Sequence, residues 1–147
     1  MTPPYNLQRF TDAQESKFII ALNEIKNGRK QGHWMWFIFP QICGLGFSET
    51  SKYYAIRDRE EAEAYLKHPV LGKRLLTICR VLLELPDNHA NRIFGSPDDL
   101  KLKSSITLFA YLNPTDLVFQ SVLDKFFDGN RDIRTLEIIE NPNREDA

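Results

Sequence analysis

Three polar residues between positions 98 and 105 have the types and the spacing of a small catalytic or binding group. Asp98, Lys101 and Ser105 follow one another at intervals of three and four residues, so on a helix they form one polar stripe beside apolar positions. A carboxylate orients or activates water, and an ammonium group neutralises phosphate or developing negative charge. The stripe is therefore either one wall of a catalytic cleft or a helix cap followed by an ordinary solvated face.

Three other charged or titratable residues extend this candidate site. His33 is either an acid or base, because histidine titrates near neutral pH, or a hydrogen-bonded structural residue. Asp132 fits either a helix cap or an acid that points into the same cleft as Lys101. Lys125 is a further cation for phosphate or developing charge. The candidate catalytic residues are Asp98, Lys101, Asp132 and His33.

An unusually apolar run, His33-Trp34-Met35-Trp36-Phe37-Ile38-Phe39-Pro40-Gln41, precedes these residues and holds both tryptophans of the chain. As a strand it would place Trp34 and Trp36 on the same face, and as a helix it would be buried nearly all round. It is either core or a wall that stacks a planar ring such as a nucleobase. Gln41 would then bind a base edge or simply satisfy a loop. The candidate ligand-binding residues are Trp34, Trp36, Gln41, Ser48, Ser105 and Lys125.

The composition excludes several classes of protein. The 147 residues suffice for one domain, and the formal net charge of −1 gives no strong signal for nucleic acid or anionic membrane. No apolar run is long enough to span a membrane, and Met1–Tyr5 lacks the features of a signal peptide. Cys43 and Cys79 fit no metal or redox spacing, and with three histidines we expect no metal site. Free thiols favour the cytoplasm; no cofactor is indicated, and the oligomeric state is open.

Helix signals dominate the pattern of the chain. We expect a mainly α, single compact domain over residues 6–140 with about six helices, at most a minimal β element and loose termini at 1–5 and 141–147. Capping patterns start helices at Thr11, Ser48, Asp58 and Ser96, where Pro97 follows at the first helical position. The regions after Asn113 and Asp132 carry two further helices. Strand signals are confined to the aromatic run and residues 91–94.

Five blocks in this order resemble the bacterial domain-of-unknown-function family 1810, sometimes mislabelled calpastatin. The resemblance covers nearly the whole chain, from Leu7 to Ile139, and implies a compact, mostly helical cytoplasmic protein without an established activity. The calpastatin label does not fit, because calpain inhibitors of that type are disordered chains and this pattern is globular. The blocks are residues 33–41, 44–48, 65–72, 94–109 and 123–129.

A more distant likeness connects the chain to NADAR-type proteins, which are linked to NAD and ADP-ribose chemistry. Ser48-Glu49, the Asp98–Lys101 segment and Lys125-Phe126 follow the order of features in those proteins. The Glu-His pair of their early helix is not reproduced, since Thr50 follows Glu49 here. That departure puts a shared catalytic mechanism in doubt.

Three functional hypotheses follow. The first is a pocket that handles a nucleotide or ADP-ribosyl group. If the protein is an enzyme, this hypothesis assigns it the hydrolysis of an N-glycosidic bond. The second is a non-catalytic module that binds a small molecule or a protein through the aromatic run. The third is an oligomeric structural protein whose tryptophans are buried between subunits. The first predicts that side chains distant in sequence converge on one pocket: His33, Gln41, Lys101, Ser105 and Asp132.

Overall fold

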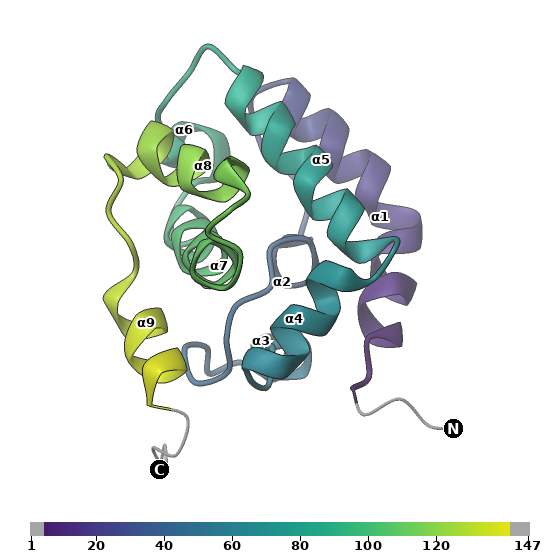
Figure 1. Cartoon of the computed structure of the whole chain (residues 1–147). Coiled ribbons are helices and arrows are strands. Elements are labelled where there is room, and N and C mark those ends of the chain that lie inside the picture. The colour runs from purple at the N-terminus through teal and green to yellow at the C-terminus, as the bar shows by residue number, and fades with distance from the viewer. Residues whose placement is uncertain (1–4, 142–147) are drawn as a thin grey trace.

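Helices make up the fold in the computed structural model, which describes residues 5–141 (Figure 1). Within that range the β structure is one isolated parallel bridge between Ile42 and Ile56. The predicted termini, 1–5 and 141–147, fall outside the described residues except for Tyr5 and Asn141. The helices are α1 (Gln8–Lys26), α2 (Met35–Ile38), α3 (Glu49–Tyr54), α4 (Arg59–Lys67), α5 (Leu71–Glu84), α6 (Ala90–Phe94), α7 (Asp98–Leu112), α8 (Leu117–Phe127) and α9 (Ile133–Glu140).

Short helices explain why the expected number, about six, is too low: the described residues form nine. The aromatic run folds into α2, and the second strand candidate, residues 91–94, lies in α6. The strand alternative was wrong in both places, whereas the helical alternative for the aromatic run is confirmed over Met35–Ile38. Helices of four or five residues contain about one turn, which is too short to show a helical period in the sequence. The burial of their apolar side chains stabilises them instead.

Side-chain caps define most of the other helix starts. Ser48, Asp58, Asp116 and Asp132 each accept a backbone N–H bond at the start of α3, α4, α8 and α9. Two predicted starts were wrong. The first helix begins at Gln8, whose carbonyl accepts the Thr11 hydroxyl, and Pro97 rather than Ser96 occupies the N-cap of α7.

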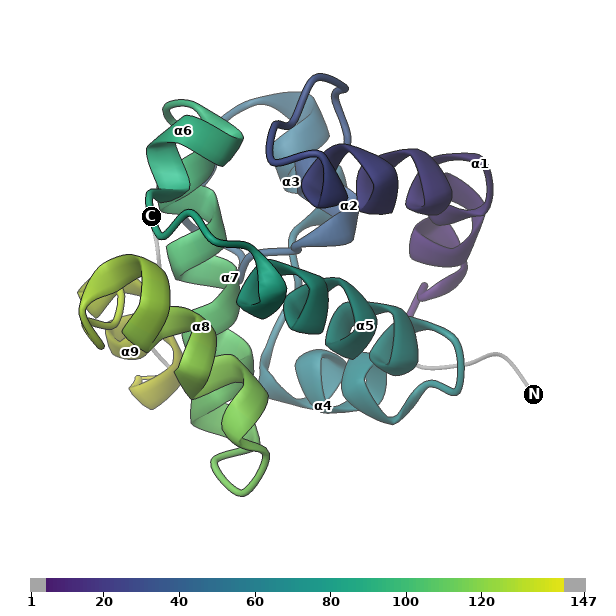
Figure 2. The ribbon, with the colours of Figure 1, turned by 90° about the horizontal axis from the view of Figure 1, so that it is seen from above.

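Helix α7 lies in the middle of the molecule. It contacts α4, α6, α8 and α9, while α1 packs along α5 on the other side (Figures 1 and 2). Every residue from Ser104 to Ala110 is buried, so this helix is enclosed all round over two turns. Only its ends reach solvent. Functional side chains on α7 are therefore expected near Asp98 at one end or near Tyr111 at the other.

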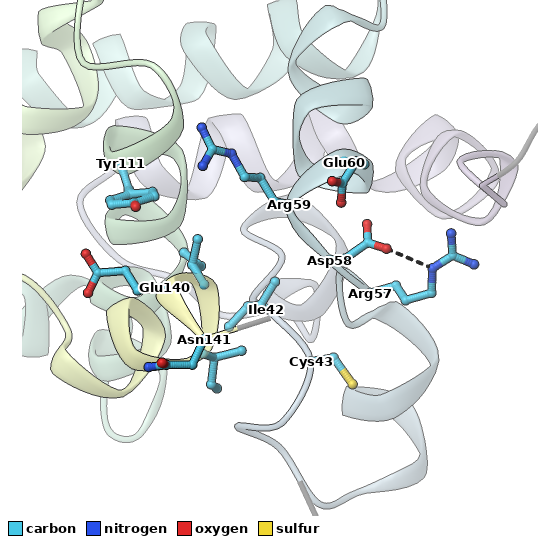
Figure 3. A pocket seen from close by; sticks show the side chains of 11 residues that line it. Ile42, Cys43, Arg57, Asp58, Arg59, Glu60, Tyr111, Glu140 and Asn141 are labelled. Carbon is cyan, nitrogen blue, oxygen red and sulfur yellow. Dashed lines mark hydrogen bonds and ion pairs between the residues drawn. The ribbon is translucent and has the colours of Figure 1, made fainter. Parts of the chain in front are cut away.

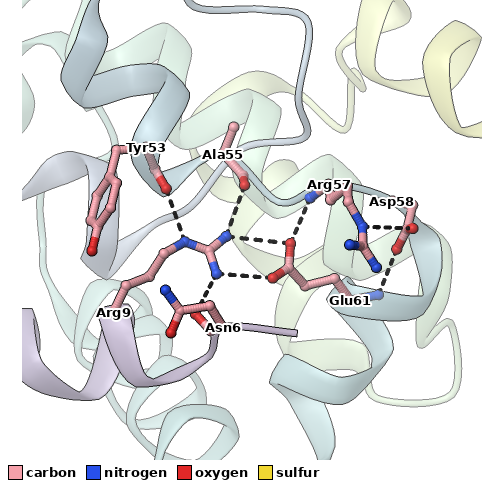
Figure 4. Close-up of polar contacts among 7 residues, drawn as sticks. All are labelled: Asn6, Arg9, Tyr53, Ala55, Arg57, Asp58 and Glu61. Carbon is pink, nitrogen blue, oxygen red and sulfur yellow. Dashed lines mark hydrogen bonds and ion pairs between the residues drawn. The ribbon is translucent and has the colours of Figure 1, made fainter. Parts of the chain in front are cut away.

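A buried ion pair fastens the start of α1 to α3 and α4 (Figure 4). The Arg9 guanidinium donates to both carboxylate oxygens of Glu61, at 2.9 and 3.3 Å, and also to the carbonyls of Asn6, Tyr53 and Ala55. Glu61, which is 2% exposed, accepts a further bond from the Arg57 N–H at 2.6 Å. All polar atoms of the pair thus have partners, as buried charges require.

Candidate functional site

A cluster of charged and aromatic side chains lies at the start of α7, where two predicted site residues meet a third. The Lys101 ammonium is 5.4 Å from the ring centroid of Trp36, and it is 3.6 Å from Asp98 Oδ1. Asp98 Oδ2 in turn pairs with Lys30 Nζ at 2.8 Å. We call Lys30, Trp36, Asp98 and Lys101 the Trp36 cluster. The spacing of Asp98 and Lys101 predicted that they share one face of the helix, which the ion pair confirms.

Lys30 is the member that the sequence did not single out. Its side chain is only 8% exposed, yet its ammonium is well supplied with partners, since it also donates to the Gly32 carbonyl at 2.5 Å and lies 5.1 Å from the Trp34 ring centroid. The Lys30 N–H binds the Ile93 carbonyl at 2.7 Å, which holds this loop against α6. Lys30 therefore fixes the position of Asp98.

Glu24 at the end of α1 holds the loop that leads into the cluster. Its Oε1 accepts bonds from the N–H groups of Gln31 and Gly32 and from the Trp34 indole, at 2.7 to 2.9 Å. Partial burial raises the pKa of this carboxyl, but the three hydrogen bonds and the charge of Lys30 outweigh that effect and the pKa is lowered. The carboxylate form of Glu24 thus stabilises the native loop.

This arrangement predicts a loss of stability in acid that depends on Glu24. Because its pKa is lower in the folded than in the unfolded chain, its contribution is complete above the unfolded pKa and disappears as the pH falls through the folded one. Urea midpoints measured from about pH 7 down to about pH 3 are expected to fall less steeply for Glu24→Gln than for the wild type. Equal slopes would contradict the assignment, and Glu15→Gln, at an exposed position of α1, is the control.

The two tryptophans have different environments. Trp34 is 1% exposed and packs against Phe39 and Phe94, with ring centroids 6.4 Å away in each case. The hypothesis that Trp34 stacks a ligand or is buried between subunits was wrong, because a single chain already encloses it. Trp36, in contrast, is only partly buried. Trp36 is the tryptophan that remains a ligand-binding candidate.

Gln41 lies near Trp36, and both line a hollow of about 10 Å³ together with Gly46 and Ser51. The hollow has room for about one water molecule and none for a ligand. A Cβ atom on Gly46 would come within 2.5 Å of the Ser51 Cβ, so a glycine is required there for close packing. A ligand of Trp36 would therefore bind on the solvent-facing side of the Trp36 cluster and not in this hollow.

Ser105 lies one helical turn beyond Lys101 along the predicted stripe. It has no exposed surface, and its Oγ is the one buried side-chain polar atom within residues 5–141 that lacks a hydrogen-bond partner. Buried hydroxyls normally find a partner, so Ser105 is an exception among the described residues. The polar stripe on α7 therefore runs from solvent into the core.

The other candidates have structural roles elsewhere. Lys125 donates to the carbonyls of Leu82 and Leu83 at 2.9 and 3.0 Å and to that of Leu85, so it caps the end of α5. Burial lowers its pKa. Asp132 caps α9, Ser48 caps α3, and His33 is exposed. The five residues predicted to line one pocket are not brought together. Gln41 lines the small hollow beside Trp36, Ser105 is buried in α7 and Asp132 caps α9, and neither this hollow nor the larger pocket at the far end of α7 includes the other four.

A larger pocket lies at the other end of α7 and was missed in the sequence. It has a volume of about 580 Å³, and its walls come from residues 42–43, 57–60, 111 and 138–141 (Figure 3). We call it the Tyr111 pocket. No local sequence motif indicates this pocket, because four separate segments of the chain form its walls. Within the described part of the chain, no three His, Cys, Asp or Glu side chains are placed to hold a metal ion.

Comparison with known protein families shows to which family the chain belongs. Residues 4–139 match the family described as "Protein of unknown function (DUF1810)". The chain belongs to this family. The DUF1810 match includes the whole Trp36 cluster and all of the Tyr111 pocket except Glu140 and Asn141. The resemblance noted in the sequence is thereby confirmed.

A solved structure extends the DUF1810 match to the fold. The chain is similar to the conserved hypothetical protein Rv1873 from Mycobacterium tuberculosis, with 42% sequence identity and a TM-score of 0.91. The alignment covers 94% of this chain and 99% of the mycobacterial one. No curated protein matches, and the likeness to NADAR-type proteins finds no support in these comparisons. Among residues 5–141, no helix is both long and apolar enough to cross a membrane.

Proposed function

We propose that the Trp36 cluster binds a phosphate-bearing small molecule of the nucleotide or ADP-ribosyl class. The observation that supports this proposal is the position of the Lys101 ammonium, 5.4 Å from the centroid of the Trp36 ring. An aromatic face stacks a base, and a neighbouring ammonium pairs with a phosphate, so the cluster combines the two groups that such a ligand needs.

The exposure of the side chains indicates how each would act. Trp36 is partly open, and the Lys101 side chain is 24% exposed, so a base can displace Lys101 from the ring while its ammonium turns to the phosphate. Lys30 is held by Asp98 and Gly32 and remains in place as a positioning residue. Asp98 and the neighbouring Glu24 carboxylate balance the charges of Lys30 and Lys101, so the Lys101 ammonium itself, once it leaves the ring, is the group that would pair with an anionic ligand.

The contacts of Asp98 favour binding over N-glycosidic hydrolysis. Hydrolysis needs a carboxylate that holds and activates a water molecule next to the sugar. Both oxygens of Asp98 already face ammonium groups, one from Lys30 and one from Lys101. Asp132 is engaged as the cap of α9, where it accepts from the Thr135 N–H and hydroxyl. We therefore propose a binding site without turnover.

Replacing Lys101 by methionine is expected to weaken ADP-ribose binding by about tenfold, because a charge-assisted hydrogen bond to phosphate is lost. Isothermal titration calorimetry of the full chain measures this change. Lys103→Met is the matched control, since Lys103 lies on the same helix with its ammonium 6.0 Å from the centroid of another aromatic ring, that of Phe127. Its affinity for ADP-ribose should equal that of the wild type.

Ribose 5-phosphate separates the roles of base and phosphate. Ribose 5-phosphate lacks the base, so it should bind to the wild type more weakly than ADP-ribose does. Trp36→Ala should weaken ADP-ribose binding until its affinity is close to that of ribose 5-phosphate. The proposal is wrong if the wild type binds neither compound, or if Lys101→Met and Lys103→Met have the same effect. Release of a free base or sugar from a nucleotide would instead contradict the assignment of binding without turnover.

A further inference from the structure

The Tyr111 pocket is a second site, independent of the Trp36 cluster. Its volume of about 580 Å³ lies in the range of small-molecule sites, roughly 300–1,000 Å³. Tyr111 and Lys101 are separated along α7 by about 15 Å, so one small ligand does not occupy both sites. A ligand bound in the Tyr111 pocket would therefore be distinct from one at the Trp36 cluster.

The floor of this pocket is apolar. Ile42 and Ile139 are buried and line it together with the half-buried Ile138, and the Tyr111 ring forms part of one wall (Figure 3). Ile42 and Ile139 have little exposed surface of their own, so the accessible apolar surface comes from Ile138 and Tyr111, and hydrocarbon that covers it removes that surface from water. A small inorganic ion would leave this surface uncovered.

The rim of the pocket carries excess negative charge. Each arginine at the rim is already paired, Arg57 with Asp58 at 3.3 Å and Arg59 with Glu63 at 3.2 Å. Glu60 and Glu140 have no ion-pair partner within residues 5–141. The residues that line the pocket thus carry three carboxylates against two guanidinium groups, and Glu60 and Glu140 are the two carboxylates without an ion pair.

These two carboxylates come from opposite sides. Figure 3 shows Glu140, at the end of α9, on the side of Tyr111, and Glu60, in the first turn of α4, on the opposite side, with the Arg59 side chain between Tyr111 and Glu60 and with Ile42 below. They are not gathered as a metal site, in agreement with the absence of such a group among residues 5–141. A ligand that satisfies both must carry two separated positive charges.

We propose that the Tyr111 pocket binds a linear aliphatic diamine or polyamine. One ammonium group pairs with Glu60 and another with Glu140, and the methylene chain lies against the half-buried Ile138 and Tyr111. Ammonium–carboxylate bonds supply the charge-assisted contacts, and the hydrocarbon contact supplies apolar burial. The Arg59 guanidinium lies 5.7 Å from the Tyr111 ring centroid, so the carboxylates rather than the ring receive the ammonium groups.

Calorimetric titration of the full chain with spermidine and with 1,4-diaminobutane, at physiological salt, tests this proposal. At least one amine should bind, whereas 1,4-butanediol, an uncharged analogue of the diamine, should not. Glu60→Gln and Glu140→Gln should each weaken binding by about tenfold, because each loses one charge-assisted contact. Glu84→Gln, at an exposed position of α5, is the control and should leave the affinity unchanged.

Alkylation of the cysteines tests whether the amine binds in the Tyr111 pocket. Cys43 lines the pocket and is exposed, whereas Cys79 is buried and its thiol pKa is raised by burial, so N-ethylmaleimide reacts first at Cys43. Spermidine should slow this alkylation in the wild type and have less effect in Glu60→Gln. The proposal is overturned if neither amine binds, if the diol binds equally well, if the glutamine variants match Glu84→Gln, or if bound spermidine leaves Cys43 alkylation unchanged.

Discussion

Trp34→Ala is expected to lower the free energy of unfolding by about 3–5 kcal/mol, the range for removing a large aromatic side chain from a packed core. The ring is 1% exposed and contacts Phe39 and Phe94, and its indole N–H binds Glu24. The variant removes this packing and leaves a cavity, while Glu24 keeps two backbone donors. Urea denaturation followed by circular dichroism measures the change.

Trp36→Ala is the matched control within the same helical turn. Trp36 is partly exposed, and its principal charged contact is with Lys101, so its removal should destabilise the fold much less than the removal of Trp34. Equal losses of stability for the two variants would contradict the division of the aromatic run into a core residue and a surface residue.

Arg9→Met is expected to destabilise the protein by about 3–5 kcal/mol, because it leaves the Glu61 carboxylate buried without its counter-ion. The loss should be larger than for an ordinary ion pair, since Arg9 also supplies donors to three backbone carbonyls. Those carbonyls belong to the start of α1 and the end of α3, so the segments would separate locally. Chemical denaturation at neutral pH measures the loss.

A double-mutant cycle separates the ion pair from the packing of the two side chains. Arg9→Met combined with Glu61→Gln should be more stable than the sum of the single effects predicts, because no unpaired charge remains buried. Arg59→Met provides the control at an exposed pair, where a loss of at most about 1 kcal/mol is expected. Strict additivity in the cycle would show that Arg9 and Glu61 do not stabilise each other.

Local signals predicted much of this DUF1810 fold. Helices α3, α4, α8 and α9 begin where a hydroxyl or carboxylate caps the first turn, and the cap is a contact between residues two or three positions apart. Helices α2 and α6 depend on tertiary burial, exemplified by Phe94, whose ring lies 5.9 Å from that of Phe39. A contact of this kind leaves no local pattern, so the sequence left strand and helix open for the aromatic run and suggested a strand for residues 91–94.

In the candidate site, too, the local contacts were predictable from the sequence and the long-range contacts were not. Asp98 and Lys101 are neighbours on one helix face, and their spacing alone predicts the ion pair. Lys30 reaches Asp98 from a distant loop, and the Tyr111 pocket depends on four separate segments. Lys125 was predicted from the sequence to bind a ligand. In the structure its ammonium instead donates to backbone carbonyls at the end of α5.

The signals of the two indole N–H groups in a ¹H–¹⁵N spectrum test the Trp36 site most directly. The Trp34 indole is buried and bound to Glu24, whereas Trp36 lies beside Lys101 at the surface. Titration with ADP-ribose should shift the Trp36 signal, assigned with Trp36→Phe, and leave the Trp34 signal nearly unchanged. If neither signal moves at saturating ADP-ribose, or if Trp34 shifts as much as Trp36, ADP-ribose does not stack at the Trp36 cluster.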